Sequence, residues 1–349
     1  MKMLILTQKM DRNDSILGFF HRWVEEFAKN CEKVIVICLY EGKHNLPENV
    51  QVLSLGKESG VSKLKYIFRF YKYIWQYRKD YENVFVHMNQ IYVILSSFLW
   101  KFLGKKIGLW YAHGGISKSL KMAERRTNIV FTSTPSGFRL KSAKIRIVGQ
   151  GIDANVFKAD RNKRDKSIFK ITTVGRISPI KDYETLIYSL ETARTKLGNL
   201  KVDIIGEACT EDDKKYLLDL KKIISSYDLD GVVNFVGPLS NEEVVPYLQR
   251  SDLFVNMSHT GSLDKAILEA MACGLSVLTC NEALLALDLK NKDDLMFVKN
   301  DVKDLSDKIL KNYLMSAEDR IKLEEYLSAF VSNTFSLDLL IAKIIKNYG

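Results

Sequence analysis

The sequence predicts an α/β protein built from two doubly wound domains. Three observations support this prediction. Short apolar runs alternate with longer helical patterns, the alternation stops once near the middle and restarts, and the chain has 349 residues. Such alternation is typical of βαβ units, whose crossovers make the strands parallel. A chain of this length is too long to fold around one hydrophobic core of ordinary size and suits two domains.

The first domain is predicted over residues 1–150. Its candidate strands are six apolar runs, at 2–7, 33–39, 50–55, 83–88, 106–112 and 128–133. Helical patterns separate several of these runs, near 16–29, 62–79, 90–103 and 116–125. The longest apolar run, 91–103, contains two Ser and Lys101, so we expect a buried helix there and not a membrane span.

The second domain is predicted over residues 151–330. A polar, aperiodic stretch at 149–169 indicates a linker before it. Its candidate strands are 169–175, 201–206, 232–237, 252–257, 275–280 and 295–298. A last helix near 333–347, within a C-terminal segment 331–349, follows no strand, and we expect it to pack on either domain. Because open parallel sheets bind ligands at the carboxyl ends of their strands, the two domains are expected to face each other across a cleft.

The basic charge of the chain is concentrated in the first domain. Residues 1–150 hold 25 Lys and Arg against 11 Asp and Glu, whereas residues 151–349 hold 27 against 31. An anionic membrane surface or a phosphorylated acceptor is the partner that this charge favours. Nucleic acid is not predicted, because no recognition motif accompanies the charge.

The helix predicted at 62–79 is the strongest indication of membrane contact. It carries six basic residues among seven aromatic ones, a combination that suits the interface of a bilayer. We therefore expect an anionic membrane surface to bind there. A solvated basic face on an ordinary amphipathic helix is the alternative explanation.

The cysteines and the N-terminus indicate a cytoplasmic protein, and the helix at 62–79 is the reason to expect it peripherally at the inner face of the membrane. The five Cys are odd in number and never spaced Cys-x-x-Cys, so neither a disulfide frame nor a zinc site is expected. The first apolar run is too short for a signal peptide, and no small-residue cleavage site follows it. No metal is predicted, because no His, Cys and Asp cluster has ligand spacing and the Asp-Leu-Asp at 228–230 precedes a strand instead of ending one.

The first candidate binding segment is residues 174–187. Gly175 lies at the turn after a strand, and Arg176 and Lys181 follow in one loop, so both cations can approach one pyrophosphate. Arg offers a bidentate fork and Lys a point charge, which suits the charge that grows on a departing diphosphate. A solvated basic loop explains the same residues equally well on spacing alone.

The second candidate segment is residues 251–280. A strand is followed by a loop with Gly261, and a helix starts near Ser262 or Asp264. The free N–H groups of a helix N-terminus suit phosphate. Glu269 lies about one and a half turns beyond Asp264, where its carboxylate can accept hydrogen bonds from ribose hydroxyls. From periodicity alone, a surface Glu on an amphipathic helix is the better explanation.

These two segments, together with those at 149–157 and 234–255, resemble the retaining glycosyltransferases of the group 1 family, which have the GT-B fold. All four motifs occur in the family's order. The resemblance implies a nucleotide-diphosphate-sugar donor, a hydroxyl acceptor and retention of configuration. It also implies that the acceptor is a glycan or glycolipid, for example a lipid-linked glycan or a cell-surface polysaccharide precursor. No cofactor is expected beside the donor substrate.

The resemblance also implies roles for single residues. The family's diphosphate loop corresponds to residues 175–182, so Gly175, Arg176 and Lys181 are expected at the donor phosphates. Glu269 matches the second Glu of the family's Glu-x-seven-Glu motif, which binds the donor ribose. The donor-binding residues predicted from the second segment are Gly261, Ser262, Leu263, Lys265 and Glu269.

The sequence departs from the family where the donor sugar binds. Gly261 replaces the family's first Glu, and Leu263-Asp264 replaces its Phe-Gly. We expect Asp264 to bring a carboxylate into the sugar pocket, and Lys265 to pair with Asp264 or to meet a charged sugar such as a uronate. An acidic residue in the first turn of a helix is also favoured by the helix dipole, which explains Asp264 equally well.

In the first domain the resemblance is weaker and marks His113. This residue follows a strand at the place where the family often has a His near the donor sugar and the reaction centre. The residues predicted to be catalytic are Arg176, Lys181, His113 and Asp264. A lone His at a strand end is otherwise often structural.

Other polar residues near the strand ends are less specific. We expect Asp11, Asp14 and Gly18 near the cleft as contacts to acceptor or diphosphate, although an Asp helix cap explains this loop equally well. His87 is expected to be structural, and the resemblance gives His259 no role.

Two further functions stay open. A sugar-nucleotide epimerase or hydrolase of the same fold would use the donor without an acceptor, and it needs more carboxylates or His poised for proton transfer than the sequence shows. A catalytically weak subunit that binds a nucleotide sugar is suggested by Gly261 in place of Glu. The retained Arg176, Lys181 and Glu269 argue against that alternative.

Overall fold

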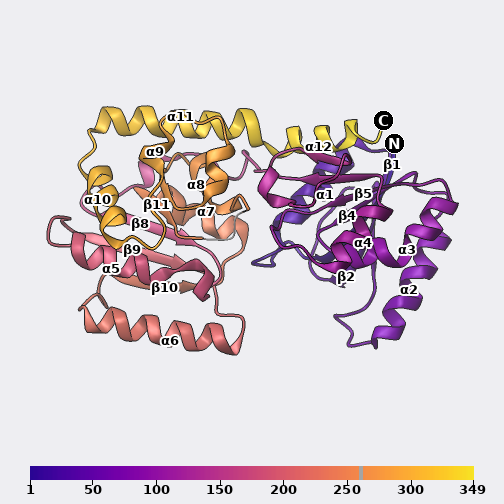
Figure 1. Cartoon of the computed structure of the whole chain (residues 1–349), viewed down its shortest axis with the longest axis horizontal. Coiled ribbons are helices and arrows are strands. Elements are labelled where there is room, and N and C mark those ends of the chain that lie inside the picture. The colour runs from indigo at the N-terminus through magenta and orange to yellow at the C-terminus, as the bar shows by residue number, and fades with distance from the viewer. Residues whose placement is uncertain (259–261) are drawn as a thin grey trace. The chain divides into compact units, whose positions relative to one another are not determined.

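The computed structural model describes residues 1–258 and 262–349, and it divides into two compact units (Figure 1). Unit 1 comprises Met1–Gly151 and Leu337–Gly349, and unit 2 comprises Ile152–Ser336. Each unit holds one sheet whose strands are all parallel. The predicted fold class, α/β with two parallel-sheet domains, is confirmed.

The sheet of unit 1 has seven strands in the order β3-β2-β1-β4-β5-β6-β7. Their bounds are β1 Lys2–Met10, β2 Lys33–Glu41, β3 Val50–Ser54, β4 Asn83–His87, β5 Lys106–Trp110, β6 Ile129–Thr132 and β7 Ile145–Ile147. All six predicted strands of this domain are present. The seventh, β7, was missed because its three residues include a charged Arg146 and give no apolar run.

Helices cover both faces of this sheet. Alternate residues of β1 enter two different cores, since successive side chains of a strand point to opposite faces. One core holds α1 Phe19–Asn30 and α12 Leu337–Lys346. The other holds α2 Lys63–Gln76, α3 Gln90–Phe102 and α4 Lys118–Arg126. Side chains of Ser62, Asn89 and Ser117 cap the N-termini of α2, α3 and α4.

The C-terminal helix differs from the prediction. The helix expected near 333–347 is two helices, because Ser336 is extended between α11 Ala317–Phe335 and α12. Only α12 belongs to unit 1. The division of the chain therefore falls inside the segment 331–349.

The sheet of unit 2 has five strands in the order β10-β9-β8-β11-β12. Their bounds are β8 Phe169–Val174, β9 Leu200–Ile205, β10 Val233–Gly237, β11 Leu253–Asn256 and β12 Ser276–Thr279. The sixth predicted strand, at 295–298, is wrong. The helix α9 Lys292–Leu295 runs directly into this segment, which leaves Met296 a single bridge to Thr279.

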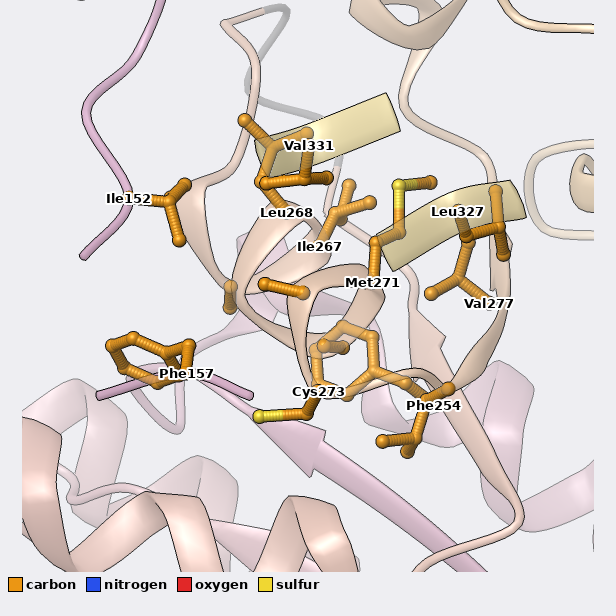
Figure 2. Packing of buried hydrophobic residues seen from close by; sticks show 14 of the residues in the cluster. Ile152, Phe157, Phe254, Ile267, Leu268, Met271, Cys273, Val277, Leu327 and Val331 are labelled. Carbon is orange, nitrogen blue, oxygen red and sulfur yellow. The ribbon is translucent and has the colours of Figure 1, made fainter. Parts of the chain in front are cut away.

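The helices of unit 2 pack in two cores on the two faces of its sheet. One core includes α5 Tyr183–Ala193, α6 Glu211–Ser226 and α10 Val302–Tyr313. The other includes α7 Asn241–Gln249, α8 Lys265–Ala272 and α11. Figure 2 shows Ile267, Leu268 and Met271 of α8 beside Leu327 and Val331 of α11. Every residue of α8 from 266 to 272 is buried, so packing fixes where this helix begins.

The stretch at 149–169 is more ordered than the predicted linker. Ile152 and Phe157 are buried in the core around α8, and the N–H of Ile152 donates to the carbonyl of Phe335 at 2.8 Å. Among the described residues, no helix combines the length and the apolar composition needed to cross a bilayer.

Candidate functional site

The two segments predicted to bind a donor meet at the centre of the unit 2 sheet. The strand order reverses direction between β8 and β11, which are neighbours in the sheet although 78 residues lie between the end of β8 and the start of β11 in the chain. At such a switch point the loops that follow the two strands diverge and leave room for a ligand. Lys181 from the first loop reaches Asp264 in the second, with 2.6 Å between Nζ and Oδ2.

Close backbone packing fixes the loop after β8. The N–H of Gly175 donates to the carbonyl of Ile205 at 2.9 Å, and Tyr183 Oη donates to the carbonyl of Gly175 at 2.9 Å. Gly206, directly after the neighbouring strand β9, has φ +148°, and a Cβ there would lie 2.0 Å from the Gly175 oxygen. Only glycine therefore fits at residue 206 beside this loop.

Asp264 lies between a lysine and a helix N-terminus. Its Oδ2 accepts from Lys181 Nζ and, at 3.1 Å, from Asn256 Nδ2, while its Oδ1 accepts from the N–H of Ala266 at 3.3 Å and caps α8. Burial of this carboxylate opposes its ionisation, but the charge of Lys181 and these hydrogen bonds outweigh it, so the pKa of Asp264 lies below its usual value.

Lys265 pairs with Glu269, whereas the prediction named Asp264 or a charged sugar as its partner. Its Nζ lies 3.1 Å from Oε1 of Glu269, one turn further along α8. The same Oε1 accepts from Asn241 Nδ2 of α7 at 3.1 Å. Because α8 is buried on all sides, Glu269 is only 5% exposed and is not the surface carboxylate that periodicity alone favoured. A buried carboxylate needs such partners, since desolvation without them is costly.

Arg176 is held less tightly than Lys181. Its side chain is 52% exposed, and its Nε lies 3.9 Å from Oδ2 of Asp213, a buried residue of the capping box that starts α6. In the same loop the hydroxyl of Ser178 is buried and has no hydrogen-bond partner within residues 1–258 and 262–349. The loop thus combines an exposed guanidinium with an unsatisfied hydroxyl.

Polar side chains at the ends of β11 and β12 complete this edge of the sheet. Asn281 Nδ2 donates to the carbonyl of Ser262 at 2.8 Å, and Leu263 is buried behind it. Neither Asn256 nor Asn281 was predicted, although a polar residue that ends a buried strand, as Asn256 does, or closely follows one, as Asn281 does, is a signal that could have marked both. Gly261 and His259 lie outside the described residues.

His113 belongs to unit 1, where it follows β5. It is exposed, and its Nδ1 accepts from the N–H of Gly115 at 3.1 Å. In the neutral ring this contact places the proton on Nε2. His87, at the end of β4, is instead buried and stacked on Phe20, with ring centroids 4.1 Å apart.

The Asp residues after β1 shape their own loop. Asp14 Oδ1 accepts from the N–H groups of Ile16 and Leu17, at 3.0 and 2.6 Å. Its Oδ2 binds Lys9 Nζ, and Asp11 Oδ1 accepts from the N–H of Asn13 at 3.1 Å. These contacts organise the turn before α1, but they are not a helix cap, because the N-cap residue of α1 is Gly18 and no side-chain hydrogen bond caps the helix. Within the described residues, no three His, Cys, Asp or Glu side chains are grouped as metal ligands.

Known proteins match the half of the chain that holds this site. Residues 154–328 match the model of the family described as glycosyl transferases group 1. The D-inositol 3-phosphate glycosyltransferase of Arthrobacter sp. (strain FB24) is 27% identical over 143 residues, which cover 38% of this chain and 33% of that protein. The mannosylfructose-phosphate synthase of Agrobacterium fabrum is 28% identical over 167 residues, 43% of this chain and 37% of the relative. The chain thus spans about a third of the length of these relatives.

A solved structure extends the likeness to both units. The structure of Anabaena HepE in complex with UDP has a TM-score of 0.79 and covers 99% of each chain, at 16% sequence identity. At that identity the likeness concerns the fold, which is GT-B, as the resemblance implied. The family match includes both segments of the site and half of the sequence. This chain is therefore a member of the group 1 glycosyl transferases.

Proposed function

We propose that this protein is a retaining glycosyltransferase, similar to hexosyltransferases, that moves a sugar from a nucleotide-diphosphate-sugar to a hydroxyl acceptor. The observation that carries the proposal is the meeting of Lys181 with the N-terminus of α8 at the switch point of the unit 2 sheet. A cation beside the positive end of a helix dipole suits a diphosphate. Family membership supports the same reaction class.

In this proposal the departing diphosphate is stabilised electrostatically. Arg176 is exposed at the loop and can turn toward an incoming phosphate, since a separation of 3.9 Å makes its contact with Asp213 weak. Lys181 and the first N–H groups of α8 supply further positive charge. Ser178 adds a hydroxyl donor that has no partner among the described residues.

The nucleoside and the sugar would contact the two acidic residues of this edge. Glu269 accepts hydrogen bonds from the ribose hydroxyls, and its contacts with Lys265 and Asn241 hold it in position for this. Asp264 supplies the carboxylate of the sugar pocket in place of the Glu that Gly261 replaces. In this proposal the reaction needs no metal. The acceptor hydroxyl attacks the sugar from the face that the diphosphate leaves, and the departing diphosphate assists this attack.

The acceptor in this proposal binds to unit 1. The excess of Lys and Arg in residues 1–150 suits a phosphorylated, lipid-linked glycan or a cell-surface polysaccharide precursor at the cytoplasmic face of a membrane. His113 is exposed and would lie near the reacting sugar.

Calorimetric titration with nucleotide sugars tests the proposal. UDP-sugars come first, because HepE has been solved with UDP and with UDP-glucose. We expect one donor to bind, and Arg176→Ala to weaken it at least about tenfold through the loss of a charge-assisted hydrogen bond. Lys196→Ala, an exposed cation beyond the far end of α5, serves as the matched control and leaves binding unchanged.

Each other outcome has its own meaning. Binding of a bare nucleoside diphosphate without any sugar form points to a catalytically weak subunit. Donor turnover without an acceptor points to a hydrolase or an epimerase. If no nucleotide binds to the intact protein, the proposal is wrong.

A further inference from the structure

Helices α2 and α3 of unit 1 each expose an apolar stripe. On α2 the exposed large side chains are Leu64, Ile67, Phe68, Tyr71 and Trp75. On α3 they are Ile91, Leu95, Phe98 and Phe102. Within each set the residues recur at the three- and four-residue spacing of a helix, so each set lies along one face of its helix. Phe98 is 85% exposed, Leu64 78%, Phe102 76% and Phe68 71%, and the four belong to both helices.

The two stripes adjoin each other. Tyr71 Oη donates to the carbonyl of Leu95 at 2.7 Å, which ties the helices together at the middle of both stripes. The opposite faces of the helices, with Phe70 of α2 and Trp100 of α3, are packed into one core against the sheet. Figure 1 shows α2 and α3 next to each other within this unit. The stripes therefore form one surface, which we call the α2–α3 surface.

This surface was only half predicted. The run at 91–103 was expected to form a buried helix, and the inner face of α3 is buried, but its outer face carries the most exposed aromatic ring of the described residues, Phe98. Single exposed apolar side chains are common on proteins, whereas contiguous apolar patches are rare and mark binding surfaces.

The charged residues of the two helices are all basic. Neither helix contains Asp or Glu. The exposed lysines on or beside the helices are Lys63, Lys65, Lys72, Lys79 and Lys101. None of the five forms an ion pair with any residue that the structure describes. Arg78, after α2, stacks its guanidinium on Trp75 at 4.4 Å from the ring centroid.

We propose that the α2–α3 surface docks on an anionic phospholipid bilayer. The aromatic and aliphatic side chains enter the boundary between headgroups and acyl chains, while the lysines extend to the lipid phosphates. Charge complementarity selects this occupant. A second copy of the same face would bring the same unpaired lysines together, with no carboxylate on either helix to neutralise them. The inference goes beyond the proposed reaction and does not depend on it.

Vesicle flotation with the full chain tests the inference. We expect the protein to float with vesicles of phosphatidylcholine mixed with phosphatidylglycerol, less at high salt, and not with phosphatidylcholine alone. The double variant Phe98→Ser, Phe102→Ser should lower the partition about tenfold or more, because it removes two rings from the lipid phase. Leu314→Ser, which alters a side chain that is 75% exposed in unit 2, is the matched control and leaves binding unchanged.

Tryptophan fluorescence gives a second readout of the same docking. Trp75 is 49% exposed, whereas Trp23, Trp100 and Trp110 are buried, so a blue shift on adding anionic vesicles reports on α2. Trp75→Phe should abolish the shift and retain flotation.

Three results would overturn the inference. The first is equal binding of the protein to neutral and to anionic vesicles, and the second is no binding of the unaltered chain to anionic vesicles. The third is a dimer of the unaltered chain in solution that the Phe98→Ser, Phe102→Ser variant does not form. Donor binding by this variant, measured by calorimetry, separates the inference from the proposed function. If this variant binds the donor but no vesicle, the substitutions have removed only the docking surface and left the donor site intact.

Discussion

Lys181 and Asp264 form an ion pair of 2.6 Å between two loops that are 83 residues apart in the chain. The cation expected to bind a diphosphate is thus already paired with a carboxylate that also caps α8. Both side chains are 17% exposed, so the pair is shielded from solvent and contributes more than a surface ion pair. This arrangement makes Asp264 the most informative position of the site.

Asp264→Ala should lower both stability and transfer activity. The variant loses a helix cap and leaves Lys181 without its partner, which together cost about 2–4 kcal/mol of unfolding free energy. Chemical denaturation measures this cost, and a sugar-transfer assay measures activity. Asp301→Ala is the control, because Asp301 caps α10 in the same way and takes no part in the site. Activity equal to that of the unaltered enzyme would exclude Asp264 from the sugar pocket.

The contribution of Asp264 to stability should depend on pH. Because the folded state lowers the pKa of this carboxyl group, its ionised form stabilises the fold above the unfolded value of about 4. The contribution is then lost as the pH falls through the lower folded value. We therefore expect the stability difference between the unaltered chain and Asp264→Asn to be constant from about pH 7 to 5 and to shrink below about pH 4. Urea denaturation at several pH values checks this, and a difference that grows on acidification would contradict it.

Glu269→Ala should destabilise unit 2 as well as weaken nucleotide binding. Removing this carboxylate from a buried ion pair breaks its contacts with Lys265 and Asn241, at a cost of about 3 kcal/mol. Glu269→Gln keeps the shape of the side chain, so it should cost less stability. It should still weaken the binding of a nucleoside diphosphate about tenfold, because the charged acceptor is lost. Thermal unfolding and calorimetry separate the two effects. Unchanged nucleotide affinity in Glu269→Gln would remove this residue from the ribose site.

Gly206→Ala should disturb the loop that carries Arg176 and Lys181. The new Cβ would lie 2.0 Å from the carbonyl oxygen of Gly175, so the loop backbone has to move. We expect a loss of several kcal/mol and weaker donor binding. Gly237→Ala is a control, because that glycine also has positive φ, at +92°, but has open space around it and should cost only about 1 kcal/mol. Equal thermal stability of the two variants would contradict the packing argument.

Sequence patterns predicted the elements of this fold better than their ends. The apolar strands were visible because buried parallel strands are nearly continuous apolar runs. The break at Ser336 and the single bridge at Met296 were not visible, since both arise from tertiary packing of segments that carry ordinary helix or strand patterns. The exposed face of α3 could not be predicted from the sequence, because the outward side chains of this helix are as apolar as its inward ones.

The site was predicted to the level of its loops but not of its contacts. The segments at 174–187 and 251–280 do meet, as the strand–loop–helix pattern indicated. Which lysine pairs with which acid could not be derived, because Lys181 approaches Asp264 from a distant part of the chain while Lys265 turns along its own helix to Glu269. Asn241 reaches Glu269 from α7, and no local pattern marks such a contact.

The crossing of the chain back into unit 1 has a consequence for biosynthesis. The core of unit 1 is completed by α12, and Tyr348 donates its hydroxyl hydrogen to the carbonyl of Val84 in the centre of the sheet at 2.8 Å. Residues 337–349 are translated only after the whole of unit 2. Residues 1–151 therefore emerge from the ribosome without α12. The fold of unit 1 can be completed only after unit 2 has been synthesised.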